Sequence, residues 1–345
     1  MTDQNTSIKD KAKAIFWFLL RLGIAAGIIA YLLSSYQGNL LESLGHFNPV
    51  WILLALCCYA SQICFGAWRW LLLLRVQGIQ LSFFEALSLT MQGIFFSLVI
   101  PGGAVGGDLA KISFLASRTP PGQKIEGAFT IFMDRFTGML GLFAVALAVP
   151  LFAGQVLKNV NGVMELALYA LVLAALGGFG AGVVFLFHKQ FENLPPFAWC
   201  LDLADKHMHG ALRRIFATLD LYKNSWKTVL FCIAGSVILV HLNIAVAVYC
   251  LARGDGAREA TLSNVVATVT IGNTAGAIPI TPSGIGARDA VINSMLKASG
   301  LPEDKALEIP LLNTAIILAY SMLGGLFFVL DSMRKKPFQK EIPAP

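Results

Sequence analysis

The sequence predicts an all-α polytopic membrane protein, and composition, apolar runs and the placement of basic residues each point to it. Of the 345 residues, 56% are hydrophobic and 13% are charged, whereas a soluble domain carries roughly 25% charged residues. The apolar residues form runs long enough to cross a bilayer, which takes about 20 residues in a helix. The formal net charge of +6 is interpreted as cytoplasmic loop charge rather than as a nucleic-acid surface.

The basic residues beside the apolar runs predict the topology. The runs occupy residues 14–36, 49–75, 83–117, 125–152, 163–187, 227–251, 260–299 and 307–331. Lys9, Lys11 and Lys13 precede the first run, and Lys335 and Lys336 follow the last, so both termini are expected in the cytoplasm. The run 14–36 is too long for the core of a signal peptide and is predicted to be an uncleaved helix in a bacterial-type inner membrane.

Segment 83–117 is predicted to enter and leave the membrane on the same side. A single crossing would make the basic connections 118–124 and 188–226 external, against the positive-inside rule. The same reasoning makes 260–299 a second re-entrant hairpin, entered from outside. The prediction is therefore six full spans and two oppositely oriented re-entrant hairpins in one domain, residues 1–345, with halves 14–187 and 227–333.

A short repeat marks the break in each hairpin. The first hairpin contains "PGGAVGGDLAK" and the second contains "TPSGIGARDA". Pro101, Gly103 and Asp108 recur at the same spacing as Pro282, Gly284 and Asp289. Paired proline- and glycine-broken segments in the two halves of a membrane protein indicate a substrate site near the bilayer midplane.

The connector 188–226 is predicted to be a basic amphipathic helix on the cytoplasmic side. Apolar residues such as Leu212, Ile215 and Leu219 recur at helical spacing, and basic residues such as Arg213 and Arg214 fall elsewhere. Two placements remain open, either on the lipid surface or against the cytoplasmic ends of the bundle.

Charged residues at membrane depth are the candidate functional residues, because they are costly there. They are Arg69, Asp108, Lys111, Asp134, Arg135, Arg288 and Asp289. Sequence proximity predicts three acid–base couples, namely Asp108 with Lys111, Asp134 with Arg135, and Arg288 with Asp289. Arg69 has no local acid, so the set carries one excess positive charge and suits an anion, most naturally a phosphate.

Structural interpretations of the same residues stay open. Asp108 and Asp289 each begin a half-helix and are equally suited to cap it. Arg135 and Arg69 are long enough to extend to the membrane interface. The glycines of the breaks also suit close helix packing.

Together, "PGGAVGGDLAK", "DRFTGMLGL" from Asp134 and "TPSGIGARDA" resemble the lysylphosphatidylglycerol synthase transmembrane family, which is flippase-like and of the UPF0104 type. The resemblance covers nearly the whole chain, although Lys111 stands where arginine is expected and Asp289 where glutamate is commoner. It implies a membrane domain that moves or binds lipids with anionic or modified headgroups. No soluble aminoacyl-transferase domain is visible here, so the resemblance does not imply lysyl transfer.

The leading functional hypothesis is a translocator or carrier for an anionic phospholipid or a polyprenyl-phosphate-linked lipid. The expected substrate-binding residues are Arg69, Pro101, Gly102, Gly103, Gly106, Gly107, Asp108, Lys111, Asp134, Arg135, Pro282, Ser283, Gly284, Gly286, Arg288 and Asp289. The headgroup is expected between the two breaks, with the acids holding the bases in place. No catalytic residue, metal or cofactor is predicted. The alternatives are a lipid-modifying membrane enzyme and a non-catalytic subunit that holds a glycosyltransferase or lipid-modifying enzyme, and the oligomeric state stays open.

Overall fold

The computed structural model describes residues 16, 45–100, 103–119, 123–152, 163–186, 219–277 and 281–334. These residues fold into helices and short connections, and no strand occurs among them, which confirms the all-α prediction. The predicted first span 14–36, except Phe16, lies outside the described residues, as does most of the connector 188–226.

Four stretches of helix are long and apolar enough to cross a membrane. They are Pro49–Val76, Lys124–Leu151, Trp226–Gly254 and Glu303–Asp331. They correspond to α3 (Pro49–Val76), α6 (Lys124–Phe152), the continuous run of α12 (Trp226–Gly235), η2 (Ser236–Leu242) and α13 (Asn243–Gly254), and α16 (Glu303–Arg334). Helix α8 (Val163–Leu186) lies on the predicted fifth segment, with a shorter apolar stretch over Val172–Leu186. The count of six spans stays a prediction.

The first predicted hairpin consists of two short helices, α4 (Phe83–Val99) and α5 (Ala104–Ala116), which pack against each other. Helix α4 begins in a capping box, in which the Ser82 side chain accepts from the Glu85 N–H and the Glu85 carboxylate accepts from the Ser82 N–H. It ends where Ile100 becomes extended, and Gly103 at φ 59° precedes α5. At 17 and 13 residues, neither helix reaches the length of about 20 needed for a span.

The second hairpin has the same plan. Helices α14 (Leu262–Ala277) and α15 (Ala287–Ala298) pack together and contain 16 and 12 residues. The break between them includes the 3₁₀ turn η3 (Pro282–Gly284), and Ser283, Gly284 and Gly286 all have positive φ values of 52°, 73° and 83°. Glycine adopts this backbone region at little cost, which explains why the break is rich in glycine.

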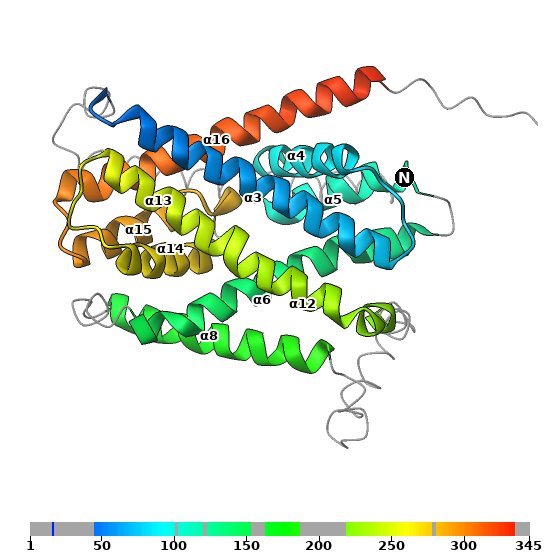
Figure 1. Cartoon of the computed structure of the whole chain (residues 1–345), viewed down its shortest axis with the longest axis horizontal. Coiled ribbons are helices and arrows are strands. Elements are labelled where there is room, and N and C mark those ends of the chain that lie inside the picture. The colour runs from blue at the N-terminus through cyan, green and yellow to red at the C-terminus, as the bar shows by residue number, and fades with distance from the viewer. Residues whose placement is uncertain are drawn as a thin grey trace, which may run out of the picture.

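The break of the second hairpin contacts the end of the first helix of the first hairpin. The Ser283 hydroxyl donates to the Ser97 carbonyl at the end of α4, over 3.2 Å. Figure 1 shows the α4–α5 and α14–α15 hairpins toward different ends of the bundle, with α3, α6 and the α12–α13 run extending along its length. The contact links the second hairpin to α4. That the hairpins enter the membrane from opposite faces stays a prediction.

The packing is that of a membrane bundle. Leu251, Val265, Ile292 and Ile309 are fully buried in one continuous core that joins α13, α14, α15 and α16. In contrast, large apolar side chains such as Leu151 are exposed on the outside. An apolar exterior of this kind is stable in lipid, and the chain is an integral membrane protein.

Candidate functional site

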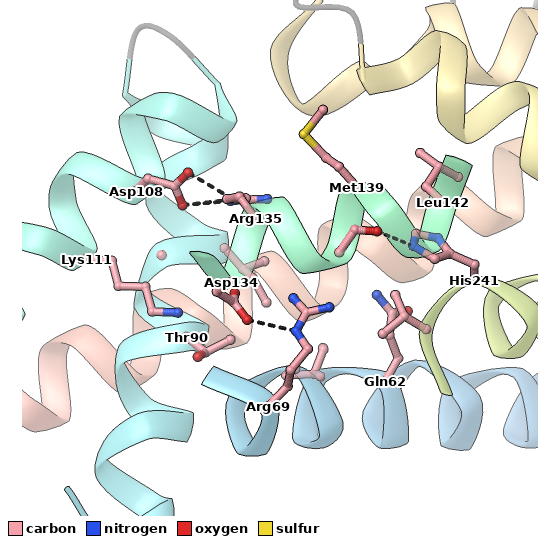
Figure 2. Close-up of a pocket in the computed structure, with 16 residues that line it drawn as sticks. Gln62, Arg69, Thr90, Asp108, Lys111, Asp134, Arg135, Met139, Leu142 and His241 are labelled. Carbon is pink, nitrogen blue, oxygen red and sulfur yellow. Dashed lines mark hydrogen bonds and ion pairs between the residues drawn. The ribbon is translucent and has the colours of Figure 1, made fainter. Parts of the chain in front are cut away.

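A polar pocket of about 300 Å³ opens between the first hairpin and three neighbouring helices. Its walls come from α3, α4, α5, α6 and η2. Figure 2 shows that charged side chains from α3, α5 and α6 point into the same space. Five of the predicted residues line it, namely Arg69, Asp108, Lys111, Asp134 and Arg135.

Arg69 is held rigidly at the middle of the pocket. Its Nε donates to Asp134 Oδ1 over 2.8 Å, and its Nη1 donates to the Ser236 hydroxyl over 2.6 Å. Gly138 leaves room for the guanidinium, since a Cβ there would lie 3.2 Å from Arg69 Nη1. Arg69 is buried, and its guanidinium is engaged inside the bundle.

Asp108 and Arg135 form a second ion pair between α5 and α6. Both carboxylate oxygens accept from Arg135, over 2.9 to 3.0 Å. The side chains are less buried than the Arg69 pair, with 50% of Arg135 and 22% of Asp108 exposed. This pair lies at the edge of the pocket and ties the first hairpin to α6.

Lys111 is the pocket cation without a carboxylate contact. It is buried, and its ammonium lies 3.6 Å from the centre of the Trp70 ring, an attractive cation–π contact. Trp70 is itself fixed by donating to the Thr130 hydroxyl over 3.0 Å. Among the described residues, no carboxylate lies within ion-pair distance of Lys111. In Figure 2 its ammonium points into the space near Thr90 and Asp134.

Arg288 and Asp289 belong to a separate buried network and do not line this pocket. Asp289 lies in the first turn of α15 and accepts from the Gly286 N–H over 2.9 Å. Asp289 therefore caps the start of this helix. It also accepts from the Thr314 hydroxyl over 2.8 Å and from Arg288 Nη2 over 3.1 Å. The network fastens the second hairpin to α16.

Two of the three couples expected from sequence proximity are wrong. Asp108 pairs with Arg135 instead of Lys111, and Asp134 pairs with Arg69 instead of Arg135. Adjacent residues on a helix point in different directions, so Asp134 and Arg135 face different partners. The couple of Arg288 with Asp289 is present.

The described proline, serine and glycine residues of the two breaks do not line the pocket. Gly107 packs so closely on α4 that an added Cβ would overlap Ser97 Oγ and Gly93 O. Pro101 and Gly102 lie outside the described residues, and Pro282 begins η3. The remaining break residues are Gly103, Gly106, Ser283, Gly284 and Gly286, none of which lines the pocket.

Sequence reasoning missed three polar residues of the pocket, Gln62, Thr90 and His241. Each has a buried polar atom with no hydrogen-bond partner among the described residues, namely Gln62 Oε1, Thr90 Oγ1 and His241 Nδ1. His241 lies in the π-helical η2, a distortion that is frequent at functional sites. The sequence signal for these residues is an uncharged polar side chain inside an apolar run. The sequence analysis considered only charged residues at membrane depth and so did not select them.

The lining has a net positive charge. Arg69, Lys111 and Arg135 exceed Asp108 and Asp134 by one charge. The acids neutralise two arginines in place, so the excess is concentrated on Lys111. The pocket thus combines one unpaired ammonium with unpaired acceptors, and no group of three His, Cys, Asp or Glu side chains suited to a metal occurs in the described part of the chain.

The fold and the site define a class, an integral membrane protein with broken helical hairpins and a pocket whose lining carries a net positive charge. Comparison with known proteins gives the family. The family described as the lysylphosphatidylglycerol synthase TM region matches residues 18–325, and the chain belongs to it. The chain is also similar to a UPF0104 membrane protein of Pyrococcus horikoshii, with 22% identity over 295 residues covering 82% of this chain and 87% of the relative.

Proposed function

We propose that this protein is a translocator or carrier for an anionic membrane lipid, either a phospholipid or a polyprenyl-phosphate-linked lipid. The observation that carries the proposal is Lys111, a buried cation in a pocket whose other cations already have carboxylate partners. A lipid phosphate placed beside this ammonium would neutralise the excess charge of the pocket.

The burial of the Lys111 ammonium supports the binding of an anion. An ammonium removed from water is costly unless it is paired. The Trp70 ring supplies part of the compensation, and a phosphate oxygen would supply the charge-assisted hydrogen bond that the described residues do not. Arg69, fixed by Asp134, would present a second set of donors at little entropic cost.

The arrangement of the hairpins supports movement of the lipid as well as binding. The headgroup would lie in the pocket beside the first hairpin while its hydrocarbon tails stay in the bilayer. Ser283 of the second break contacts Ser97 in α4 of the first hairpin, so a rocking of one half against the other would change the surroundings of the pocket. Transport across the bilayer is the proposed outcome of such rocking.

The test is leaflet exchange of a fluorescent phosphatidylglycerol in proteoliposomes. Lys111→Met removes the charge and keeps the apolar stem. We expect exchange to slow by about tenfold to a hundredfold, which is the effect of losing a hydrogen bond to a charged group.

The matched control is Lys297→Met. Lys297 pairs with Glu303 at the surface, outside the pocket, and its removal should leave exchange unchanged. Unaltered exchange in the Lys111→Met protein contradicts the proposed role of Lys111, and no exchange in the unmodified protein contradicts translocation of a phospholipid.

A further inference from the structure

The pocket has two chemically different ends. Figure 2 shows Lys111, Asp108 and Arg135 toward one end, and Gln62 and His241 toward the other, with Arg69 between them. Figure 2 shows Met139 and Leu142 toward the second end, where they add apolar walls. No carboxylate belongs to this second end among the described lining residues.

The second end offers hydrogen-bond acceptors that lack donors. Gln62 Oε1 and His241 Nδ1 are both buried without a partner among the described residues. His241 Nε2 lies 2.9 Å from the Gly138 carbonyl, which only accepts, so Nε2 carries the proton. In the neutral ring Nδ1 is then an acceptor. Buried acceptors without donors are costly, and a bound group that donates would relieve that cost.

We propose that this end of the pocket selects lipids whose phosphate carries a small uncharged hydroxyl-bearing group, such as glycerol or a single sugar ring. The inference rests on the proposed function. Hydroxyls match the two acceptors, and a phosphodiester with one negative charge matches the single excess positive charge of the lining. An ammonium headgroup fits less well, because it would lie beside Arg69 without a carboxylate and would leave the lipid with no net charge.

The size of the pocket limits the group further. A volume of about 300 Å³ stands at the lower end of the range for ligand pockets, roughly 300–1,000 Å³. One hydroxylated group beside a phosphate is therefore accommodated, while a longer oligosaccharide would extend out of the pocket.

The test is lipid competition followed by native mass spectrometry on the full chain. The competing lipids are phosphatidylglycerol, phosphatidylinositol, phosphatidic acid and phosphatidylethanolamine. We expect phosphatidylglycerol or phosphatidylinositol to be retained over the other two, and their ratio distinguishes glycerol from a ring polyol. Gln62→Met should reduce the preference for the hydroxylated lipid over phosphatidic acid by about fivefold, the effect of losing one neutral hydrogen bond.

The matched control is Gln92→Met. Gln92 Oε1 is also buried and unpartnered among the described residues, but Gln92 does not line the pocket, so the preference should persist. Equal retention of phosphatidic acid, a preference for phosphatidylethanolamine, or equal effects of the two variants would overturn the inference. Failure to retain any anionic lipid would instead contradict the proposed function. The lipid preference of the unmodified protein decides the matter even if a variant does not fold.

Discussion

At the scale of single residues, charges in this bundle divide into those that build the fold and those that face the pocket. Arg288 and Asp289 satisfy each other and Thr314 inside the protein. Lys111 is buried to a similar extent but faces a cavity. Burial and charge alone do not separate the two cases, whereas the partners do.

Removing one member of the Arg288 pair should destabilise the fold more than removing both. Arg288→Met leaves the Asp289 carboxylate buried and uncompensated, at a cost of about 3–5 kcal/mol in free energy of unfolding. The double variant Arg288→Met with Asp289→Asn should recover most of this loss, because the amide still accepts from Gly286 and Thr314. Thermal unfolding of the purified protein, followed by tryptophan fluorescence, measures both. Equal losses in the single and double variants would show that the pair is not coupled.

The sequence predicted the five charged residues that line the pocket, but not how they pair. The repeat and the apolar context are local signals, and they led to all five charged residues of the pocket. Pairing depends on how helices far apart in sequence face each other, as in Arg69 with Asp134. Only the structure identifies Gln62, Thr90 and His241 as candidate site residues, because it shows that they line the same pocket.

At the scale of elements, the first hairpin depends on close contact between α4 and α5. Gly107 allows this contact, since a Cβ there would overlap the Ser97 hydroxyl and the Gly93 backbone. The break itself was predictable from the sequence. The proline, the repeated glycines and the short second half of the segment are local features that can be recognised without knowing how the helices pack.

Gly107→Ala should therefore weaken the hairpin. The added methyl must push α5 away from α4, at a cost of about 1–3 kcal/mol in free energy of unfolding. Gly177→Ala in α8 is the control, because its Cβ meets nothing within 4 Å, and it should stabilise the helix by up to about 1 kcal/mol. Chemical denaturation in detergent compares the two. An effect of Gly107→Ala no larger than that of the control would argue against tight packing of the hairpin.

The end of α13 contains a carboxyl group that makes stability depend on pH. Burial, and then the nearby Glu308 carboxylate, raise the pKa of Asp255 to about 7. The unfolded pKa is about 3.9, so the folded state binds the proton more tightly. This contribution to stability is present below about pH 4 and is lost as pH rises through about 7.

We expect the unfolding temperature to rise as pH is lowered from about 8 to about 6, in the window that the Asp255 pKa defines. Asp255→Asn stays neutral and should flatten that dependence. Differential scanning fluorimetry across this range measures it. A variant with the same pH dependence as the unmodified protein would assign the effect to another group.

At the scale of the whole molecule, the break of the second hairpin contacts α4 of the first, while the pocket is lined by residues of the first hairpin and by none of the described residues of the second. The repeat predicted the symmetry of the hairpins but not the asymmetry of the site. The asymmetry arises because Arg288 donates to Thr314 and Asp289 accepts from Gly286. In the first hairpin, by contrast, Lys111 faces an open pocket.

The most direct test of the central claim is cysteine accessibility labelling in intact membrane vesicles, with the native cysteines replaced. Four exposed positions receive single cysteines, Gln80→Cys and Ser117→Cys around the first hairpin, and Glu259→Cys and Asp304→Cys around the second. The account predicts that a membrane-impermeant reagent labels Gln80→Cys and Ser117→Cys from one side, and Glu259→Cys and Asp304→Cys from the other. Labelling of Gln80→Cys and Ser117→Cys from different sides would contradict it.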